Sequence, residues 1–168
     1  MIFSLNTALA PIAKKVFHKN QPVAFSYGDI EALHRWIAVM DKKQLEQSLG
    51  IAGSNKYPLI WLVEGWEGKD HFSQIKFSNV TFHISVNATA PAINEQRVAN
   101  FKINYLVAND FIKKLQTFCT ISEDTLDFTE RANFRTSDKT NTSDFWDTLI
   151  VKMDLIININ CLKKHVAL

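Results

Sequence analysis

The chain has 168 residues, of which 46% are hydrophobic and 21% are charged, and its formal net charge is only +2. This length and balance are typical of one globular domain with a sizeable core. The small net charge argues against a protein that grips nucleic acid mainly through phosphates, because that task needs a dense basic face.

The first 28 residues predict a helix followed by a short strand. Helical spacing joins four apolar residues, which are Leu5, Leu9, Ile12 and Val16. Pro11 would kink this helix unless the helix begins near it. The stretch "PVAFSYGD" then alternates apolar and other residues, which predicts a strand that ends at Gly28.

A second helix and a buried strand are expected next. Asp29 is a good N-cap, and Ile30, Leu33 and Ile37 follow it at helical spacing. The run "YPLIWLVEGW" suits a strand that is buried on both faces. Pro58 should lie at the beginning of that strand or at a sheet edge, because proline cannot donate to the ladder.

Residues 75–86 alternate with a period of two, which predicts another strand. The phase of the alternation changes at Ser78–Asn79, as expected for a β-bulge or a hairpin corner. The clearest helix follows, with an apolar stripe predicted to face the sheet at Val98, Phe101, Tyr105, Ala108, Ile112 and Leu115. On this prediction Phe101→Ala would cost about 3–5 kcal/mol.

The segment after this helix is polar and poor in aliphatic residues. It predicts a long loop or a weak hairpin. Within it, Asp127–Ser143 is expected to be the least ordered internal segment, because it can bury little apolar area.

The chain then continues into one unusually long predicted strand, Leu149–Cys161. At ~3.3 Å per residue it would span roughly 43 Å, whereas most strands have about 3–10 residues. Such a strand needs a long partner, either another long strand or a neighbouring subunit. We predict that it pairs with Ile75–Val86, and that part of this pair or its adjoining loop contacts a neighbouring subunit. The expected core face is Val151, Met153, Leu155, Ile157, Ile159 and Cys161. The opposite, mixed face is Ile150, Lys152, Asp154, Ile156, Asn158 and Asn160.

Together these elements predict one α+β domain over residues 1–168, with an antiparallel or mixed sheet, helices packed mainly on one face and a long β-hairpin. No apolar run approaches the ~18 residues of a membrane span. The first lysines follow the first apolar stretch, which is the reverse of a secretory signal. We therefore expect a soluble protein of a cytoplasm.

No cluster of residues points to catalysis, a metal or another cofactor. The five histidines show no metal-ligand spacing, and we expect them to be surface or strand-face residues. Cys119 and Cys161 are expected to be reduced and mostly buried. Asp147 is expected just before the long strand and Asp154 on its wetter face. The sequence thus favours a protein that is not an enzyme and needs no cofactor.

Six residues are candidates for a subunit or partner interface. Trp66 and Phe72 are large aromatics in or beside a glycine-containing loop, where packing back onto the sheet is the alternative. The other four are charged and are Arg131, Arg135, Lys152 and Asp154. Charge reversal at Lys152 and Asp154 together is expected to change stability by less than about 1 kcal/mol while blocking assembly.

Four segments, in order, carry a resemblance: "YGDIEALHRWI", "KYPLIWLVEG", "INEQRVANFKINYLVANDFIKKL" and "DFWDTLIVKMDLIININC". They resemble a family of small, uncharacterised proteins encoded by phages and prophages of Bacteroidetes-type bacteria. The shared positions are Tyr27–Gly28, Tyr57 to Ile60, Arg97 with Phe101, and Asp144 to Cys161. The overall plan is also similar to that of the tail-terminator and tail-completion proteins of long-tailed phages.

The resemblance implies a structural virion protein of the tail and neck, present in the host cytoplasm during assembly. Such proteins form rings, usually hexamers, that cap the tail tube and join it to the head–tail connector. The implied partners are copies of the chain itself, the tube protein and the connector proteins, with at most passing contact with DNA in the lumen and none with a membrane. The alternative is a small ligand-binding domain or enzyme whose site is built from scattered residues.

Overall fold

The structure is a computed structural model that describes residues 4–39, 56–88, 94–134 and 145–161. Its elements are α1 (Leu5–Ala13), β1 (Phe17–His18), β2 (Gln21–Pro22), β3 (Ala24–Gly28), α2 (Ile30–Val39), β4 (Leu59–Val63), β5 (Glu67–His71), β6 (Gln74–Ala88), α4 (Asn94–Gln116), β7 (Thr120–Ile121), the short 3₁₀ helix η1 (Glu123–Thr125), β8 (Asp127–Phe134) and β9 (Phe145–Asn158).

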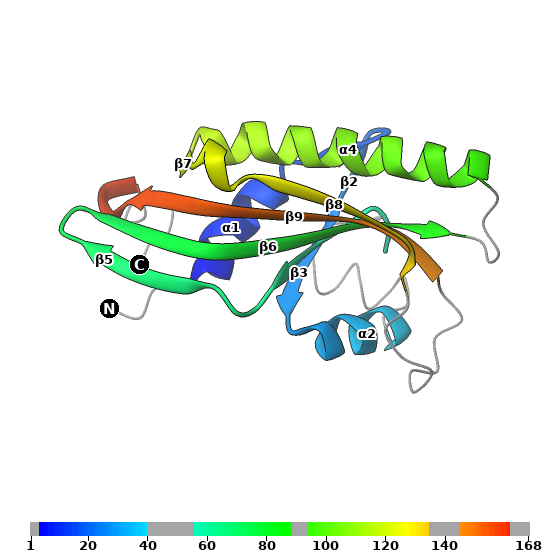
Figure 1. The fold of residues 1–168 in the computed structure, drawn as a ribbon, viewed down its shortest axis with the longest axis horizontal. Coiled ribbons are helices and arrows are strands. Elements are labelled where there is room, and N and C mark those ends of the chain that lie inside the picture. The colour runs from blue at the N-terminus through cyan, green and yellow to red at the C-terminus, as the bar shows by residue number, and fades with distance from the viewer. Residues whose placement is uncertain (1–3, 40–55, 89–93, 135–144, 162–168) are drawn as a thin grey trace.

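Seven strands form the main sheet, in which β6 and β9 are the long central pair (Figure 1). On one side, β4 and then β5 pair with successive parts of β6, and β3 adds to β4. On the other side, β7 and β8 pair with successive parts of β9. The β3–β4 pair is parallel and the others are antiparallel. The predicted α+β fold with a mixed sheet is confirmed.

The long strand pairs with the predicted partner. β6 and β9 run antiparallel from Gln74 opposite Asn158 to Ala88 opposite Phe145. The strand begins earlier than expected and ends at Asn158, where the Asn160 N–H donates to the Asn158 side chain at 2.8 Å. This capping bond turns the chain into a helical turn at residues 159–161, so Ile159 and Cys161 lie beyond the strand.

The phase change in β6 is a bulge, as predicted. The β6–β9 register shifts between Phe77 and Val80, and Asn79 has a left-handed backbone with φ of 60°. Asparagine tolerates this conformation better than most residues. The bulge keeps Phe77 and Val80 on the same buried face although three sequence steps separate them.

Helices cover both faces of the sheet, with α1 and α4 on one face and α2 on the other (Figure 1). Under α1 and α4 lies the main core, which includes Phe82, Phe111, Val151 and Leu155. Under α2 lies a smaller core of Ala24, Leu33, Ile37, Leu59, Trp61 and Trp146. β4 is therefore buried on both faces, as predicted. The Ala32 N–H donates to Asp29 Oδ1 at 2.6 Å, which confirms Asp29 as the N-cap of α2.

The predicted face of α4 is right in its second half and wrong in its first. Ala108, Ile112 and Leu115 are buried, whereas Val98 is 70% exposed and Phe101 and Tyr105 are only half-buried. The helix instead buries Asn100 and Asn104 in its first half. Its phase is decided there by hydrogen bonds to Asp147 of β9, because buried polar groups need partners.

The expected disorder of Asp127–Ser143 is wrong for its first eight residues. Asp127–Phe134 forms β8, which pairs with β9 from Asp127 opposite Lys152 to Phe134 opposite Trp146. Of the two predicted structures, a long loop or a weak hairpin, the hairpin is therefore correct for Asp127–Phe134. The hydrogen bonds to β9 order this segment, although its polar sequence can bury little apolar area by itself. The remainder, residues 135–143, lies outside the described residues.

Candidate functional site

A face of the central strands that mixes polar and apolar residues is the first candidate surface. It lies on the side of the sheet opposite α1 and α4, where β9 contributes Ile150, Lys152, Asp154, Ile156 and Asn158. Lys152 and Asn158 are exposed, and the other three residues are half-buried. The predicted mixed character of this face is confirmed, and so is the dry opposite face, where Val151, Met153, Leu155 and Ile157 are buried.

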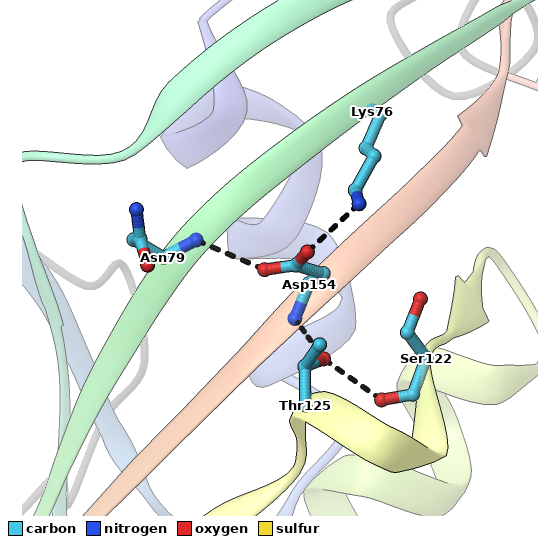
Figure 2. Close-up of polar contacts among 5 residues, drawn as sticks. All are labelled: Lys76, Asn79, Ser122, Thr125 and Asp154. Atoms are coloured by element: carbon cyan, nitrogen blue, oxygen red, sulfur yellow. Dashed lines mark hydrogen bonds and ion pairs between the residues drawn. The ribbon is translucent and has the colours of Figure 1, made fainter.

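Asp154 holds three elements together on this face (Figure 2). Its carboxylate forms an ion pair with Lys76 Nζ at 3.0 Å and accepts a hydrogen bond from the Asn79 N–H at 3.1 Å. Its own N–H donates to Thr125 Oγ1 at 2.8 Å. Its carbonyl oxygen accepts from the Ser122 N–H at 3.1 Å. The side chain thus closes the β6 bulge, and the backbone anchors the η1 turn.

Burial and hydrogen bonding act in opposite directions on this carboxyl group. Burial by itself would raise the pKa of Asp154. The Lys76 ammonium and the Asn79 N–H stabilise the charged form, and Ser78 adds a further hydrogen bond, so the net pKa lies below its ordinary value. Asp154 is therefore an ionised structural residue. The premise that this position is merely solvated is wrong, so we now expect charge reversal here to lower stability.

Alanine substitutions should show that Asp154 contributes more to stability than its neighbour Lys152. The Asp154 side chain is only 14% exposed, and Asp154→Ala removes the partner of both Lys76 and the Asn79 N–H. We expect the free energy of unfolding to fall by about 1–2 kcal/mol. Lys152→Ala on the exposed part of the same strand should change it by less than about 0.5 kcal/mol. Urea denaturation of both variants measures the difference, and equal losses would contradict a structural role for Asp154.

The hairpin of β5 and β6 is the second candidate surface. His71 pairs with Gln74, so Phe72 and Ser73 form a two-residue turn at its tip. Phe72 is fully exposed (106%) and has a left-handed backbone with φ of 49°. Trp66, the other aromatic predicted for an interface, is half-buried and packs against the main core. The exposed aromatic of this region is therefore Phe72.

The predicted interface residues that the structure describes do not form one patch. Phe72 lies at the hairpin tip, while Lys152 and Asp154 lie along β9. Arg131 is exposed on β8, opposite Thr148 of β9. Arg135 lies outside the described residues. The described candidates are instead spread over the β5–β6 hairpin, the central strand β9 and β8.

A buried polar cluster beneath α4 was not foreseen. Asp147, expected to precede the strand, is fully buried within β9. Asn100 Nδ2 donates to Asp147 Oδ2 at 2.8 Å, and Asn104 Nδ2 donates to the Asp147 carbonyl oxygen at 2.9 Å. The signal was present in the sequence, since Asn100 and Asn104 continue the helical spacing of Val107 and Phe111. The predicted stripe of α4 included only apolar residues and therefore left out both asparagines.

Two titratable side chains on the other face are also buried. His83 of β6 and His34 of α2 have almost no exposed surface. Burial, with smaller effects of the charges at His34 and Lys152, lowers the pKa of His83 to about 4. Burial also lowers the pKa of His34. Both histidines are therefore neutral at pH 7, and His83 is a strand-face residue of the interior rather than of the surface.

The cysteines are free, and burial raises the pKa of Cys119 to about 12. Within the four described ranges, no group of three or more His, Cys, Asp or Glu residues could hold a metal ion. No helix in this part of the chain is long and apolar enough to cross a membrane. No protein-family model matches the chain, and no curated protein sequence is similar to it.

Proposed function

We propose that the protein is a structural virion subunit, a tail-terminator or tail-completion protein that forms a ring on the tail tube and joins it to the head connector. The observation that carries the proposal is the β5–β6 hairpin, which displays a fully exposed phenylalanine at its tip. The resemblance of four segments to an uncharacterised phage and prophage family supports a viral origin, and the similarity of the overall plan to tail-terminator proteins supports this role.

Phe72 is unfavourable for the isolated fold in two ways. A two-residue hairpin turn favours Asn or Gly, and a left-handed backbone costs a residue such as Phe about 1–2 kcal/mol. Its ring also exposes apolar area to water. Neither cost is offset within the described part of the chain. Exposed aromatic side chains of this kind are typical anchors of protein interfaces.

The first partners in this proposal are other copies of the chain. Their association can be tested with the purified protein alone. The tube protein on one side and the connector proteins on the other complete the contacts, and DNA passes through the lumen. The protein would reside in the tail or neck of the virion after assembly in the host cytoplasm.

One observation favours a second candidate function, a small ligand-binding domain or enzyme. Asn104 Oδ1 is buried and has no hydrogen-bond partner among the described residues. Together with the buried carboxylate of Asp147, it could receive a donor group of a small molecule. Since the amide nitrogens of both asparagines already bond to Asp147, a role in anchoring α4 accounts for more of the cluster.

Native mass spectrometry and negative-stain microscopy of the purified protein test the assembly proposal. We expect rings, with six subunits as the leading stoichiometry. A protein that stays monomeric up to about 1 mM, where even weak contacts are populated, would contradict it.

Phe72→Asn should separate folding from assembly. Asparagine tolerates a left-handed backbone, so the free energy of unfolding should stay unchanged or rise by up to about 1 kcal/mol. Ring formation, measured by native mass spectrometry, should be lost. Phe17→Asn, at another exposed phenylalanine on β1, is the matched control and should leave the rings intact. Rings that survive Phe72→Asn would remove Phe72 from the interface.

A further inference from the structure

Four strands of the main sheet have one unpaired edge within the described residues, and they are β3, β5, β7 and β8. Of these, β7 has only two residues, and β3 borders β4 rather than the central pair. β5 has five residues and pairs only with β6, while β8 has eight residues and pairs only with β9. The two strands lie on opposite sides of the central pair (Figure 1). An exposed strand edge presents backbone N–H and C=O groups that can pair with another chain.

We propose that β5 of one copy pairs with β8 of the next copy, so that the sheet continues from subunit to subunit. This inference rests on the proposed ring and names its contact. The strands β5, β6, β9 and β8 alternate in direction. A second copy in the same orientation therefore brings its β5 antiparallel to β8. The contact joins two different surfaces, and contacts of this type form rings when the rotation between copies closes.

The charges on the two edges favour antiparallel over parallel pairing. On the face away from α4, β5 carries Glu67, Lys69 and His71, and β8 carries Asp127, Thr129 and Arg131. Antiparallel pairing centred on Lys69 and Thr129 places Glu67 opposite Arg131 and His71 opposite Asp127. Parallel pairing would place Glu67 opposite Asp127. Opposite charges stabilise cross-strand pairs, and like charges destabilise them.

The positions of the two edges also suit a closed ring. Lys69 pairs with Lys76 of β6, which in turn pairs with Ile156 of β9. Thr129 pairs with Ile150 of β9, six residues before Ile156. Each copy is thus displaced from the preceding one by roughly 20 Å along the strand direction. The four strands β5, β6, β9 and β8 of one copy extend the sheet by roughly 19 Å across the strands. The strands would be inclined by about 45° to the ring axis, close to the ~35–45° tilt of closed barrels.

The same register gives Phe72 a neighbour. Phe72 follows His71, and Leu126 precedes Asp127, so the hairpin tip of one copy comes beside Leu126 of the next. Leu126 is half-buried at the border of the main core, with Phe128 close by along the chain. An aromatic ring there would remove apolar surface of both copies from water.

Cysteine cross-linking between separately purified variants tests the register. Lys69→Cys and Thr129→Cys are each made in a Cys161→Ser background, since the buried Cys119, whose pKa is about 12, should stay unreactive. Oxidation of a mixture of the two variants should give a disulfide-linked dimer, which each variant alone should not give. Lys69→Cys mixed with Asp127→Cys, in a register shifted by two residues, is the matched control and should link at least tenfold less.

Exchange of one charge pair supplies an independent measurement on the chain with its native cysteines. Glu67→Arg and Arg131→Glu should each weaken self-association about tenfold, and the combined variant should restore it. Thr129→Cys that links to itself would indicate a two-fold β8–β8 contact and overturn the inference. Rings that form without the cross-link, and tolerate both single reversals, would overturn the inference while leaving the proposed function intact. A monomer up to about 1 mM would overturn both.

Discussion

Phe111→Ala should lower the free energy of unfolding by about 3–5 kcal/mol, because the truncation leaves a cavity in the main core. Phe111 is buried between α4 and the sheet, and its ring meets Phe82 edge to face, with centroids 5.1 Å apart. Urea or guanidinium denaturation measures the loss. It should be among the largest of any single truncation on α4, since the other buried side chains of this helix are smaller.

Phe101→Ala is the matched control on the same helix. Phe101 is only half-buried, so we expect a loss below about 2 kcal/mol. The value of about 3–5 kcal/mol expected from the sequence belongs to Phe111 and not to Phe101. Equal losses in the two variants would show that α4 packs with a different phase.

Acidification should destabilise the protein through His83 before most carboxylates titrate. The unfolded chain binds a proton at His83 near the ordinary pKa of about 6.5, whereas the folded protein binds it only near a pKa of about 4. Between these values the unfolded state holds more protons, so stability rises with pH. Above pH ~6.5 His83 is neutral in both states and has no effect of this kind. The free energy of unfolding falls by about 3 kcal/mol as the pH is lowered from there to about 4.

His83→Gln tests this assignment, because glutamine cannot titrate. Denaturation midpoints measured across this pH range should change less in the variant than in the native chain. His34 contributes in the same direction, since burial lowers its pKa as well, so some slope should remain. The lowered pKa of Asp154 adds a loss only below its ordinary value of about 3.9, outside this range. An unchanged slope in His83→Gln would contradict the neutral, buried histidine.

The strand predictions succeeded where one pattern dominated. The alternation in residues 75–86 located β6 and its bulge, and the long apolar run beginning at Leu59 located a strand buried on both faces. Such patterns are local, because period-two alternation reports directly which residues lie on which face. The same logic correctly identified the dry face of β9, including Val151 and Leu155.

The failures occurred where polar residues are buried or where a partner strand supplies order. Asn100 and Asn104 face the core only because Asp147, more than 40 residues later, accepts their hydrogen bonds. β8 is ordered because it pairs with β9 from Asp127 to Arg131 and again at Phe134. Neither condition can be detected within a short window of sequence.

The sequence by itself determined the fold class, the long β6–β9 pair, the bulge and the mixed face of β9, because each follows from local periodicity and length. Only the tertiary structure decided the phase of α4, the structural role of Asp154 and the isolation of Phe72 at a hairpin tip. Those features depend on contacts between residues distant in sequence, such as Asp154 with Lys76 and Asn79. Long-range contacts are set by how the elements pack. A carboxylate that the sequence places on the wetter face of a strand is therefore, in the folded chain, the group that closes a bulge.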